Sequence, residues 1–319
     1  MPPPPPRVSP TGYGAYPAAF VARQRSAGFY IAVIGGSFAV IALILMGIIG
    51  SAVHSAKGGV FSSKEIAVLD ITGEIVTAEK IDTQLRRFAD DDAVKAIILH
   101  INSPGGGASP SQEIYHEVLR LRQEKHKKIV ASIDTVGASG AYYIASACDR
   151  IYANQASVVG SIGVVMEWTN YGDLFHWIKL KSIDIHDGEL KTAGDPKRDM
   201  TPKEQAYFQS LVDNMYGQFI RDVATGRRMP EDKVKPLATG QVWTGQQALP
   251  LGLIDKEGGL RVAVMDTAKE VGITGEPSVL HPTRQSPGLL SLLFANGEEL
   301  LPSASHLLQR SPGFYFLWQ

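Results

Sequence analysis

Three parts of the sequence supply the residue types that acyl transfer requires. Ser139 lies among small residues in TVGASGAYYIASACDRI (135–151), the glycine run NSPGGG (102–107) precedes it, and an isolated lysine, Lys191, follows it. A hydroxyl nucleophile, backbone N–H donors for a developing oxyanion and an amine base are the minimum parts of such a site. These residue types favour a serine hydrolase or another α/β protein that binds a carbonyl group.

The surroundings of Ser139 allow two interpretations. Gly137 and Gly140 let the backbone turn sharply into a helix, whose first N–H groups would face a substrate oxygen. A serine before a helix is also a common N-cap with no role in catalysis. The glycines of residues 102–107 likewise either direct an amide toward a substrate carbonyl or form an ordinary loop between a strand and a helix.

The base that would activate Ser139 is not identified by the pattern alone. Of the eight histidines, His176 lies in an apolar helix-like run and His100 in a strand-like run. None combines a loop setting with a nearby carboxylate, as a triad base would. A buried lysine can serve as a base because burial lowers its pKa. The composition does not choose among the lysines, so the base stays open at this point.

Apolar strand-like runs alternate with amphipathic helical patterns from residue 65 onward. The expected strands are 66–71, 96–101 and 128–133, and the expected helices are 78–91, 111–125, 141–148, 204–227 and 261–272. Apolar strands joined by helices predict a parallel sheet that is covered on both faces. Ligands of such sheets bind beyond the carboxyl ends of the strands. Residues 102–107 and 136–139 both follow strands, so the architecture independently predicts a site there.

The N-terminal region predicts a membrane anchor. Residues 29–53 carry no charge and, at about 1.5 Å per residue, are long enough to cross a hydrocarbon core of about 30 Å. The proline-rich residues 1–28 predict a disordered cytoplasmic tail, and residues 54–64 a linker. Arginines precede the span and no acidic residue occurs before Glu65, so the positive-inside rule predicts a cytoplasmic N-terminus. A buried core helix and a cleaved signal peptide are the alternatives.

Charge and cysteine content exclude other classes. The net charge of -1 and the lack of a long basic run give no indication of nucleic-acid binding. Cys148 is the only cysteine, which excludes an intramolecular disulfide, and its small and apolar neighbours predict a buried structural thiol. We expect no metal and no cofactor, because the chemistry named above needs neither.

Five motifs in order resemble the bacterial signal peptide peptidase family in its short, single-repeat form. They are INSPGGG, ASGAYYIASACDRI, GSIGVV, GELKTAGDPKRDMTPKE and LGLID, and the resemblance covers about residues 65–272. It implies the α/β fold of the Clp protease subunit and the crotonases, with repeated ββα units and a mainly parallel sheet. The resemblance therefore predicts a peptidase domain over residues 65–275 and leaves residues 276–319 as a C-terminal tail.

The resemblance also implies a role for each site residue. Ser139 corresponds to the nucleophile of the family and Lys191 to its general base. Ser161, in GSIG, resembles a serine that orients the lysine amine. Gly106 and Gly140 resemble the donors of the oxyanion hole, through their backbone N–H groups. These roles follow from the family and not from spacing.

The resemblance implies a membrane-anchored serine endopeptidase that degrades cleaved signal peptides and other membrane-associated peptides. We expect it in the inner membrane of a bacterium, with a single span and a periplasmic or extracytoplasmic catalytic domain. The expected partners are peptide substrates, the membrane through residues 29–53, and further copies of the chain in a ring. Tethering would raise the effective concentration of the domain against membrane-borne substrates.

Three alternatives remain open at the level of sequence. An inactive anchored scaffold would bind peptides without needing Ser139 or Lys191. A crotonase-like acyl-CoA enzyme would need no anchor and would normally use a carboxylate as acid and base. A stomatin-associated membrane protease of the same superfamily would normally carry additional membrane spans.

Overall fold

The computed structural model describes residues 64–282 and 313–318 and, in the N-terminal region, Val40, Leu43 and Met46. The chain divides into two units, Met1–Ser62 and Ser63–Gln319. Apart from the three named positions, the predicted membrane span at residues 29–53 lies outside the described residues. Among the residues that are described, no helix combines the length and the apolar character needed to cross a bilayer.

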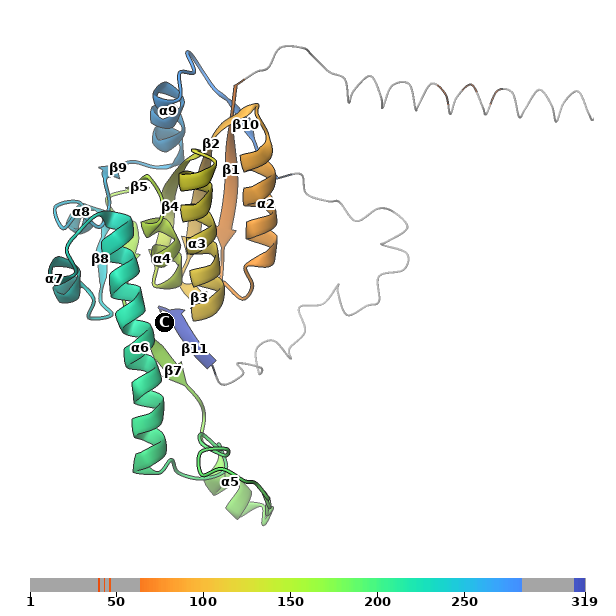
Figure 1. Ribbon diagram of the computed structural model, residues 1–319, viewed down its shortest axis with the longest axis vertical. Helices are drawn as coiled ribbons and strands as arrows, with labels where there is room; N and C mark the ends of the chain where they lie inside the picture. Colours follow the sequence, from red (N-terminus) through yellow and green to blue (C-terminus); the bar gives the residue numbers. More distant parts are fainter. Residues whose placement is uncertain (1–39, 41–42, 44–45, 47–63, 283–312, 319) are drawn as a thin grey trace, which may run out of the picture. The chain divides into compact units, whose positions relative to one another are not determined.

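A mostly parallel sheet of eight strands is the centre of the second unit (Figure 1). Its order is β10-β1-β2-β4-β5-β9, with β6 paired to β4 and β8 paired to β6. The strands are β1 (Glu65–Thr72), β2 (Val94–Ser103), β4 (Lys128–Ala138), β5 (Arg150–Ala153), β6 (Val158–Gly160), β8 (Val242–Thr244), β9 (Lys256–Glu257) and β10 (Ser278–Leu280). Only the pairing of β6 with β8 is antiparallel among the described pairs of this sheet. The predicted α/β class with a mainly parallel sheet is confirmed.

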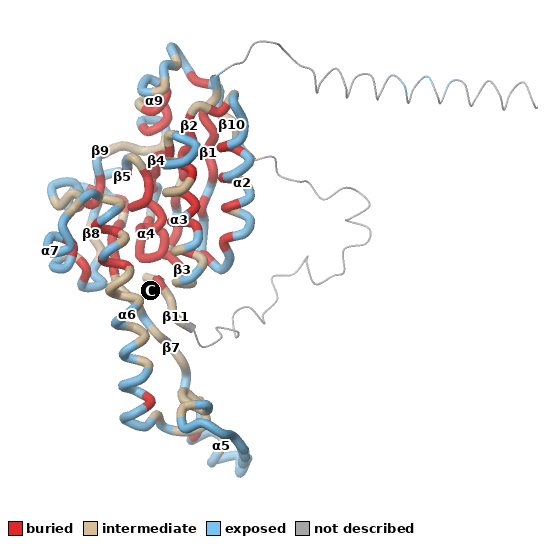
Figure 2. Tube along the Cα trace, in the orientation of Figure 1, coloured by how far each residue is buried: buried red, intermediate tan, exposed pale blue. Residues whose placement is uncertain are grey.

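The apolar strands form because helices cover both faces of the sheet. Successive side chains of β2 alternate between the faces, so Ile97 and Leu99 join one buried cluster and Ile98 joins another. The first cluster packs against α2 (Glu79–Asp90), α3 (Ala108–Glu124), α4 (Gly140–Ser146) and α6 (Pro202–Arg227), and the second against α9 (Leu260–Glu270). The unbroken burial of residues 66–69 in β1 and 96–99 in β2 follows from this two-sided cover (Figure 2).

The five helices predicted from the sequence are confirmed, with ends shifted by a few residues. The shorter elements are α5 (Gly172–Trp177), α7 (Glu231–Val234), the 3-10 turn Lys235–Leu237 and α8 (Gly245–Ala248). Thr201 and Thr244 each begin a helix with a complete capping box, whose partners are Glu204 in α6 and Gln247 in α8.

A second, antiparallel sheet of three strands lies beside the first. It is formed by β3 (Gly105–Gly107), β11 (Gly313–Leu317) and β7 (Val165–Glu167), with β11 in the middle. The sequence predicted residues 276–319 only as a tail, yet β10 and β11 both come from it. Part of this segment therefore contributes strands to the two sheets.

A long excursion separates β7 from α6. We call residues 168–201 the arm; it contains α5 and lies at the end of α6 that is remote from α4 (Figure 1). The C-terminal half of α6 is buried at Phe219, Ile220 and Val223, whereas its first half is mostly exposed (Figure 2). The helix thus connects the core to the exposed arm.

Candidate active site

Ser139 occupies a sharp turn between β4 and α4. Its backbone has φ 53° and ψ -117°, a conformation that residues other than glycine rarely adopt. The turn is held because the Ser139 amide donates to the Gly160 carbonyl at 2.7 Å and the Tyr143 amide donates to the Ser139 carbonyl at 2.8 Å. A nucleophilic serine is commonly presented on such a strained strand-to-helix turn. No described side chain forms a hydrogen bond with the Ser139 hydroxyl.

The two glycines predicted as oxyanion donors come close to Ser139. Gly140 is the first residue of α4. Its N–H therefore has no acceptor within the helix, because no preceding helical turn supplies a carbonyl. A Cβ atom at Gly105 would lie 2.7 Å from the Gly140 nitrogen, so the glycine run packs directly on the start of α4. This approach requires glycine at position 105, where φ is +101°.

The N–H of Gly106 faces away from Ile75, which follows β1, and toward β11. The Ile75 amide donates to the Gly105 carbonyl and the Gly107 amide donates to the Ile75 carbonyl, both at 2.8 Å. Because N–H groups alternate sides along an extended strand, the N–H of Gly106 points to the opposite edge of β3. The predicted donors Gly106 and Gly140 therefore border one space, next to Ser139.

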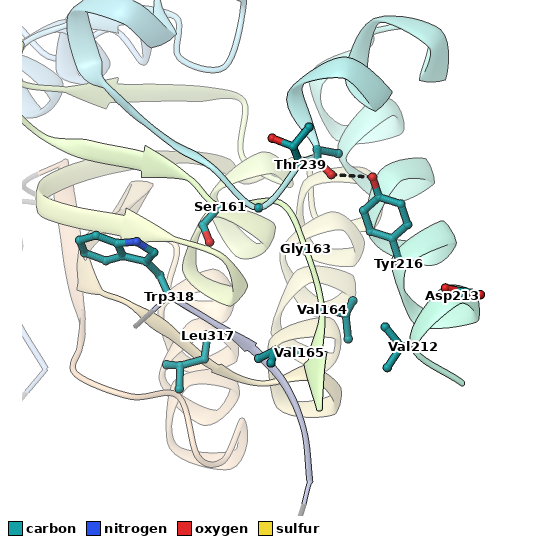
Figure 3. A pocket seen from close by; sticks show the side chains of 12 residues that line it. Ser161, Gly163, Val164, Val165, Val212, Asp213, Tyr216, Thr239, Leu317 and Trp318 are labelled. Atoms are coloured by element: carbon teal, nitrogen blue, oxygen red, sulfur yellow. Dashed lines mark hydrogen bonds between the residues drawn. The ribbon is translucent and has the colours of Figure 1, made fainter. Parts of the chain in front are cut away.

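Ser161 follows the residue that holds the turn at Ser139. It is buried, its φ is 51°, and its amide donates to the Gln241 carbonyl at 2.8 Å. Ser161 lines a cavity of about 600 Å³ together with Leu317, Trp318 and residues of α6 (Figure 3). Tyr216 of α6 closes another side of this cavity, and its hydroxyl donates to the Ala238 carbonyl at 2.5 Å.

Lys191 is not brought to Ser139 within one chain. It lies in the arm, in a turn where its amide donates to the Gly188 carbonyl at 3.0 Å, and its side chain is exposed. The structure therefore brings Ser139, Gly140, Gly106 and Ser161 together and leaves Lys191 apart. Its role as base stays a prediction.

Among the described residues, no histidine forms a hydrogen bond with Ser139. His100 does have a carboxylate partner, Asp70, at 2.9 Å from its Nδ1, a pairing across β1 and β2 that the sequence did not reveal. Both residues lie on strands, and neither contacts Ser139. No group of histidine, cysteine and carboxylate side chains among residues 64–282 and 313–318 has the arrangement of a metal site.

Cys148 is buried, as the sequence predicted. Its thiol has no disulfide partner, and burial raises its pKa above the ordinary value for a thiol. A protonated, water-excluded thiol is a poor nucleophile, so we assign Cys148 to packing.

An aromatic cluster beside the site was missed by the sequence interpretation. Phe316 of β11 packs on Phe219 and Tyr143, with ring centroids 4.6 and 5.2 Å away. The hydroxyl of Tyr143 donates to Asp222 and accepts from Gln112, and burial together with the Asp222 carboxylate raises its pKa. The run GFYFLW is typical of a strand, but nothing in the sequence indicates where that strand pairs.

The chain is similar to known peptidases. The model of "Peptidase family S49" matches residues 121–274, which include Ser139, Ser161 and Lys191. A putative protease of Synechocystis sp. is 34% identical over 245 residues, 76% of this chain and 88% of that protein. A putative signal peptide peptidase SppA of Enterococcus faecium is 31% identical over 248 residues, covering 74% of this chain and 72% of that protein. A chloroplastic serine protease SPPA of Arabidopsis thaliana is 31% identical over 73% of this chain and 35% of that protein.

Proposed function

Because the chain belongs to peptidase family S49 and is a serine peptidase, we propose that Ser139 is its nucleophile and that Lys191 of a neighbouring copy is its base. The predicted membership of the signal peptide peptidase family is confirmed by the same relatives. The observation that carries the proposal is the strained turn at Ser139, which lies against the glycine strand β3.

The proposed reaction has two steps. The Ser139 oxygen attacks the substrate carbonyl carbon while the neutral Lys191 amine takes the hydroxyl proton, and the amine returns this proton to the leaving nitrogen. An ester to Ser139 remains. Water then attacks the ester carbonyl, Lys191 takes one of its protons, and the carboxylate product leaves as Ser139 regains its hydrogen.

The N–H groups of Gly140 and Gly106 are the proposed oxyanion donors. Both belong to backbone that is held before substrate arrives, Gly140 by α4 and Gly106 by the pairing of β3 with Ile75. Preorganised donors stabilise charge that develops in the transition state, and removing one such donor commonly lowers kcat by about 100- to 1,000-fold.

Two observations support a base that comes from another copy. Lys191 is exposed and lies in the arm, at a distance from Ser139 along α6. The arm also exposes large apolar side chains: Trp177 is 81% exposed, Ile183 84% and Ile185 98%. Contiguous exposed apolar residues mark an interaction surface. A second copy that covers the arm would bury these side chains and bring Lys191 to another chain's Ser139.

Ser161 is the proposed partner of the incoming amine. It lies beside Ser139 and lines the cavity shown in Figure 3, which is large enough to admit a lysine side chain. A hydroxyl there would accept a hydrogen bond from the amine and fix its position. Burial of that amine between two copies would favour its uncharged form, which a base requires.

We also propose a tethered location and a peptide substrate. Residues 29–53 would anchor the chain in a bacterial inner membrane, with the N-terminus cytoplasmic and the peptidase unit outside the cytoplasm. Cleaved signal peptides and other membrane-associated peptides are the proposed substrates. The support for this substrate class is the similarity to a putative signal peptide peptidase together with the predicted anchor.

Two single substitutions test the proposal. Ser139→Ala and Lys191→Ala are each expected to abolish cleavage of casein and of a synthetic signal peptide. The size of the assembly, measured by light scattering, should stay unchanged. Lys179, an exposed lysine on the same arm, provides the matched control, and Lys179→Ala should retain activity. Full turnover by Lys191→Ala would reject this lysine as the base, and full turnover by Ser139→Ala would reject the nucleophile.

A further inference from the structure

Two buried serines form hydrogen bonds with the backbone of the glycine strand β3. Ser103, the last residue of β2, accepts a hydrogen bond from the Gly105 amide at 3.1 Å, and Ser111 of α3 donates to the Gly107 carbonyl at 2.8 Å. Both serines are 0% exposed. The proposed oxyanion donor Gly106 lies between the two bonded glycines, so a side chain holds β3 at each end.

A third hydrogen bond decides which way the N–H of Gly106 points. The C=O and N–H groups of one trans peptide unit point to opposite sides. Because the Ile75 amide holds the Gly105 carbonyl on one side at 2.8 Å, the N–H of Gly106 is turned to the other side. Ser103 bonds to the amide that precedes this peptide unit, and Ser111 bonds to the carbonyl that follows it. The peptide unit that carries the donor is therefore held on both flanks.

Ser111 also contacts the start of α4, where the second proposed donor lies. A Cβ atom at Gly140 would overlap the Ser111 hydroxyl and would lie 3.2 Å from the Ser111 Cβ atom. Gly140 does not have a positive φ, so the lack of space, and not the backbone conformation, requires glycine at this position. One hydroxyl group of α3 therefore contacts both β3 and the first residue of α4.

The contact with Gly140 distinguishes Ser111 from an ordinary helical serine. Inside a helix, a serine hydroxyl commonly donates to the carbonyl three or four residues earlier without any role in catalysis. Ser146 of α4 is such a serine: it is buried, and its hydroxyl donates to the Tyr143 carbonyl at 2.7 Å. The acceptor of Ser111 is instead Gly107 of β3, and its oxygen lies against Gly140. Ser146 is therefore a matched control for Ser111.

We propose that Ser111 and Ser103 are positioning residues, which fix the direction and the spacing of the N–H groups of Gly106 and Gly140. This inference rests on the proposed function, because it takes Ser139 as the nucleophile. Each serine acts through the glycine backbone that it contacts, and Ser111 has the larger effect because it contacts both β3 and α4. The two hydroxyl groups hold the donors in place before substrate binds, and preorganised donors stabilise the charge that develops in the transition state.

The first experiment removes each hydroxyl group in the full chain. Ser111→Ala is expected to lower kcat for a fluorogenic peptide about 10- to 100-fold, with KM changed less than about twofold, because the donors are displaced and act only in the transition state. Ser103→Ala should lower kcat by a smaller factor. Ser146→Ala should keep kcat within about twofold. An unchanged kcat in Ser111→Ala or Ser103→Ala, or an equal loss in Ser146→Ala, would overturn the inference.

A transition-state analogue separates positioning from a general loss of stability. A peptide aldehyde accepts the Ser139 oxygen at its carbonyl carbon, and its own oxygen then lies at the donors. The Ki of this aldehyde should rise in Ser111→Ala by the factor by which kcat/KM falls, while the Kd of the matching peptide alcohol should change less than about twofold. An unchanged Ki of the aldehyde, or an equal weakening of both ligands, would overturn the inference.

A double-mutant cycle tests the contact between Ser111 and Gly140. Gly140→Ala should lower kcat/KM at least about 100-fold, because its Cβ atom would overlap the Ser111 hydroxyl. Ser111→Gly makes room for that atom, so the losses should not add. The double variant should be at least about tenfold more active than the product of the two single effects predicts. Additive losses in a folded double variant would overturn the contact.

Ser139→Ala separates this inference from the proposed chemistry. This variant should cleave no peptide and should bind the aldehyde no more tightly than the alcohol. Cleavage that survives in Ser139→Ala would reject the proposed function. An inactive Ser139→Ala together with a full kcat in Ser111→Ala would leave the nucleophile in place and overturn only the positioning role.

Discussion

Strained backbone gathers around Ser139. Ser139 and Ser161 have φ of 53° and 51°, and Gly105 and Gly160 have φ of +101° and +96°. A non-glycine residue in such a conformation costs about 1–3 kcal/mol and persists only where its surroundings hold it. Here the backbone conformations are held by two hydrogen bonds: the Ser139 amide donates to the Gly160 carbonyl and the Ser161 amide donates to the Gln241 carbonyl. Glycine would relieve the strain at Ser139 and Ser161, so the hydroxyl groups are what these positions require.

A substitution at Gly105 tests whether activity requires the close approach of β3 to α4. Gly105→Ala is expected to lower kcat/KM at least about 100-fold. Its Cβ would lie 2.7 Å from the Gly140 nitrogen and would overlap the position of the Phe316 carbonyl oxygen. Steady-state kinetics on a peptide substrate measures this loss.

Gly73→Ala is the matched control for this loss. Gly73 also has a positive φ, +71°, but a Cβ there would meet no atom within 4 Å. Its cost should be about 1 kcal/mol of stability, with activity retained at temperatures where the fold persists. Equal losses of activity in the two variants would show that strain alone, and not the contact, is responsible.

At the scale of elements, α2 and α3 are joined by a buried acidic pair. Asp82 of α2 is 2% exposed, and Glu117 of α3 binds Arg86 and Arg120. One oxygen of Asp82 has no hydrogen-bond partner in the described residues. Burial first, and the neighbouring carboxylates second, raise the pKa of Asp82 to about 6, while Arg86 opposes the shift. The interface therefore favours a protonated Asp82.

The raised pKa of Asp82 predicts that the stability of the fold decreases as the pH rises from about 4 to about 6. The folded state holds the Asp82 proton up to about pH 6, whereas the unfolded chain releases it near the ordinary value of 3.8. Stability is thus lost between these two values and stays low above them. Between pH 4 and 7, the free energy of unfolding of the wild type should fall by about 1–2 kcal/mol relative to that of Asp82→Asn. This is less than the full pKa shift of Asp82 would give, because water screens the side of Asp82 that faces Arg86. Urea titrations at several pH values check this, and parallel curves for the two proteins would contradict it.

At the scale of the whole molecule, the residues of the proposed active site are divided between the compact core and the arm. The core supplies Ser139, Gly140, Gly106 and Ser161, and the arm carries Lys191. We propose that another copy of the chain covers the arm, because exposed apolar residues mark interaction surfaces. Assembly would then be a condition for activity and would restrict cleavage to places where copies meet.

Charge placed on the arm should separate copies. Ile185→Asp changes a side chain that is 98% exposed, so the stability of one chain should change by less than about 0.5 kcal/mol. The assembly, measured by light scattering on the purified full chain, should dissociate and lose activity. Val262→Asp on α9, a side chain that is 39% exposed, is the control and should keep both. An intact, active assembly of Ile185→Asp would argue against the arm as an interface.

Mixed assemblies test whether Lys191 acts on another chain. Ser139→Ala and Lys191→Ala chains, co-expressed with different tags, should each be inactive alone. Random mixing would restore about one quarter of the sites, because half of the chains keep Ser139 and half of the neighbours keep Lys191. Activity in the doubly tagged fraction measures this. Failure to recover activity in assemblies shown to contain both chains would indicate that serine and base come from one chain.

The sequence by itself determined the strands β1, β2 and β4 of the central sheet, the principal helices and the position of Ser139 after β4. These features depend on neighbouring residues: runs of Val and Ile, apolar residues at helical spacing, and small residues at a turn, all of which act over a few positions. The glycines of residues 105–107 were predicted as a source of N–H groups for the same reason.

Only the tertiary structure decided that β11 lies between β3 and β7, that Phe316 meets Tyr143 and Phe219, and that Lys191 lies far from Ser139. Residues 105 and 317 pair across more than half of the chain. Such pairings depend on which edges and pockets remain after the core has packed, and a strand-like run such as GFYFLW contains no information about its partner or register. The separation of Lys191 from Ser139 has the same origin, because the length and exposure of α6 and the arm follow from packing and not from local sequence pattern.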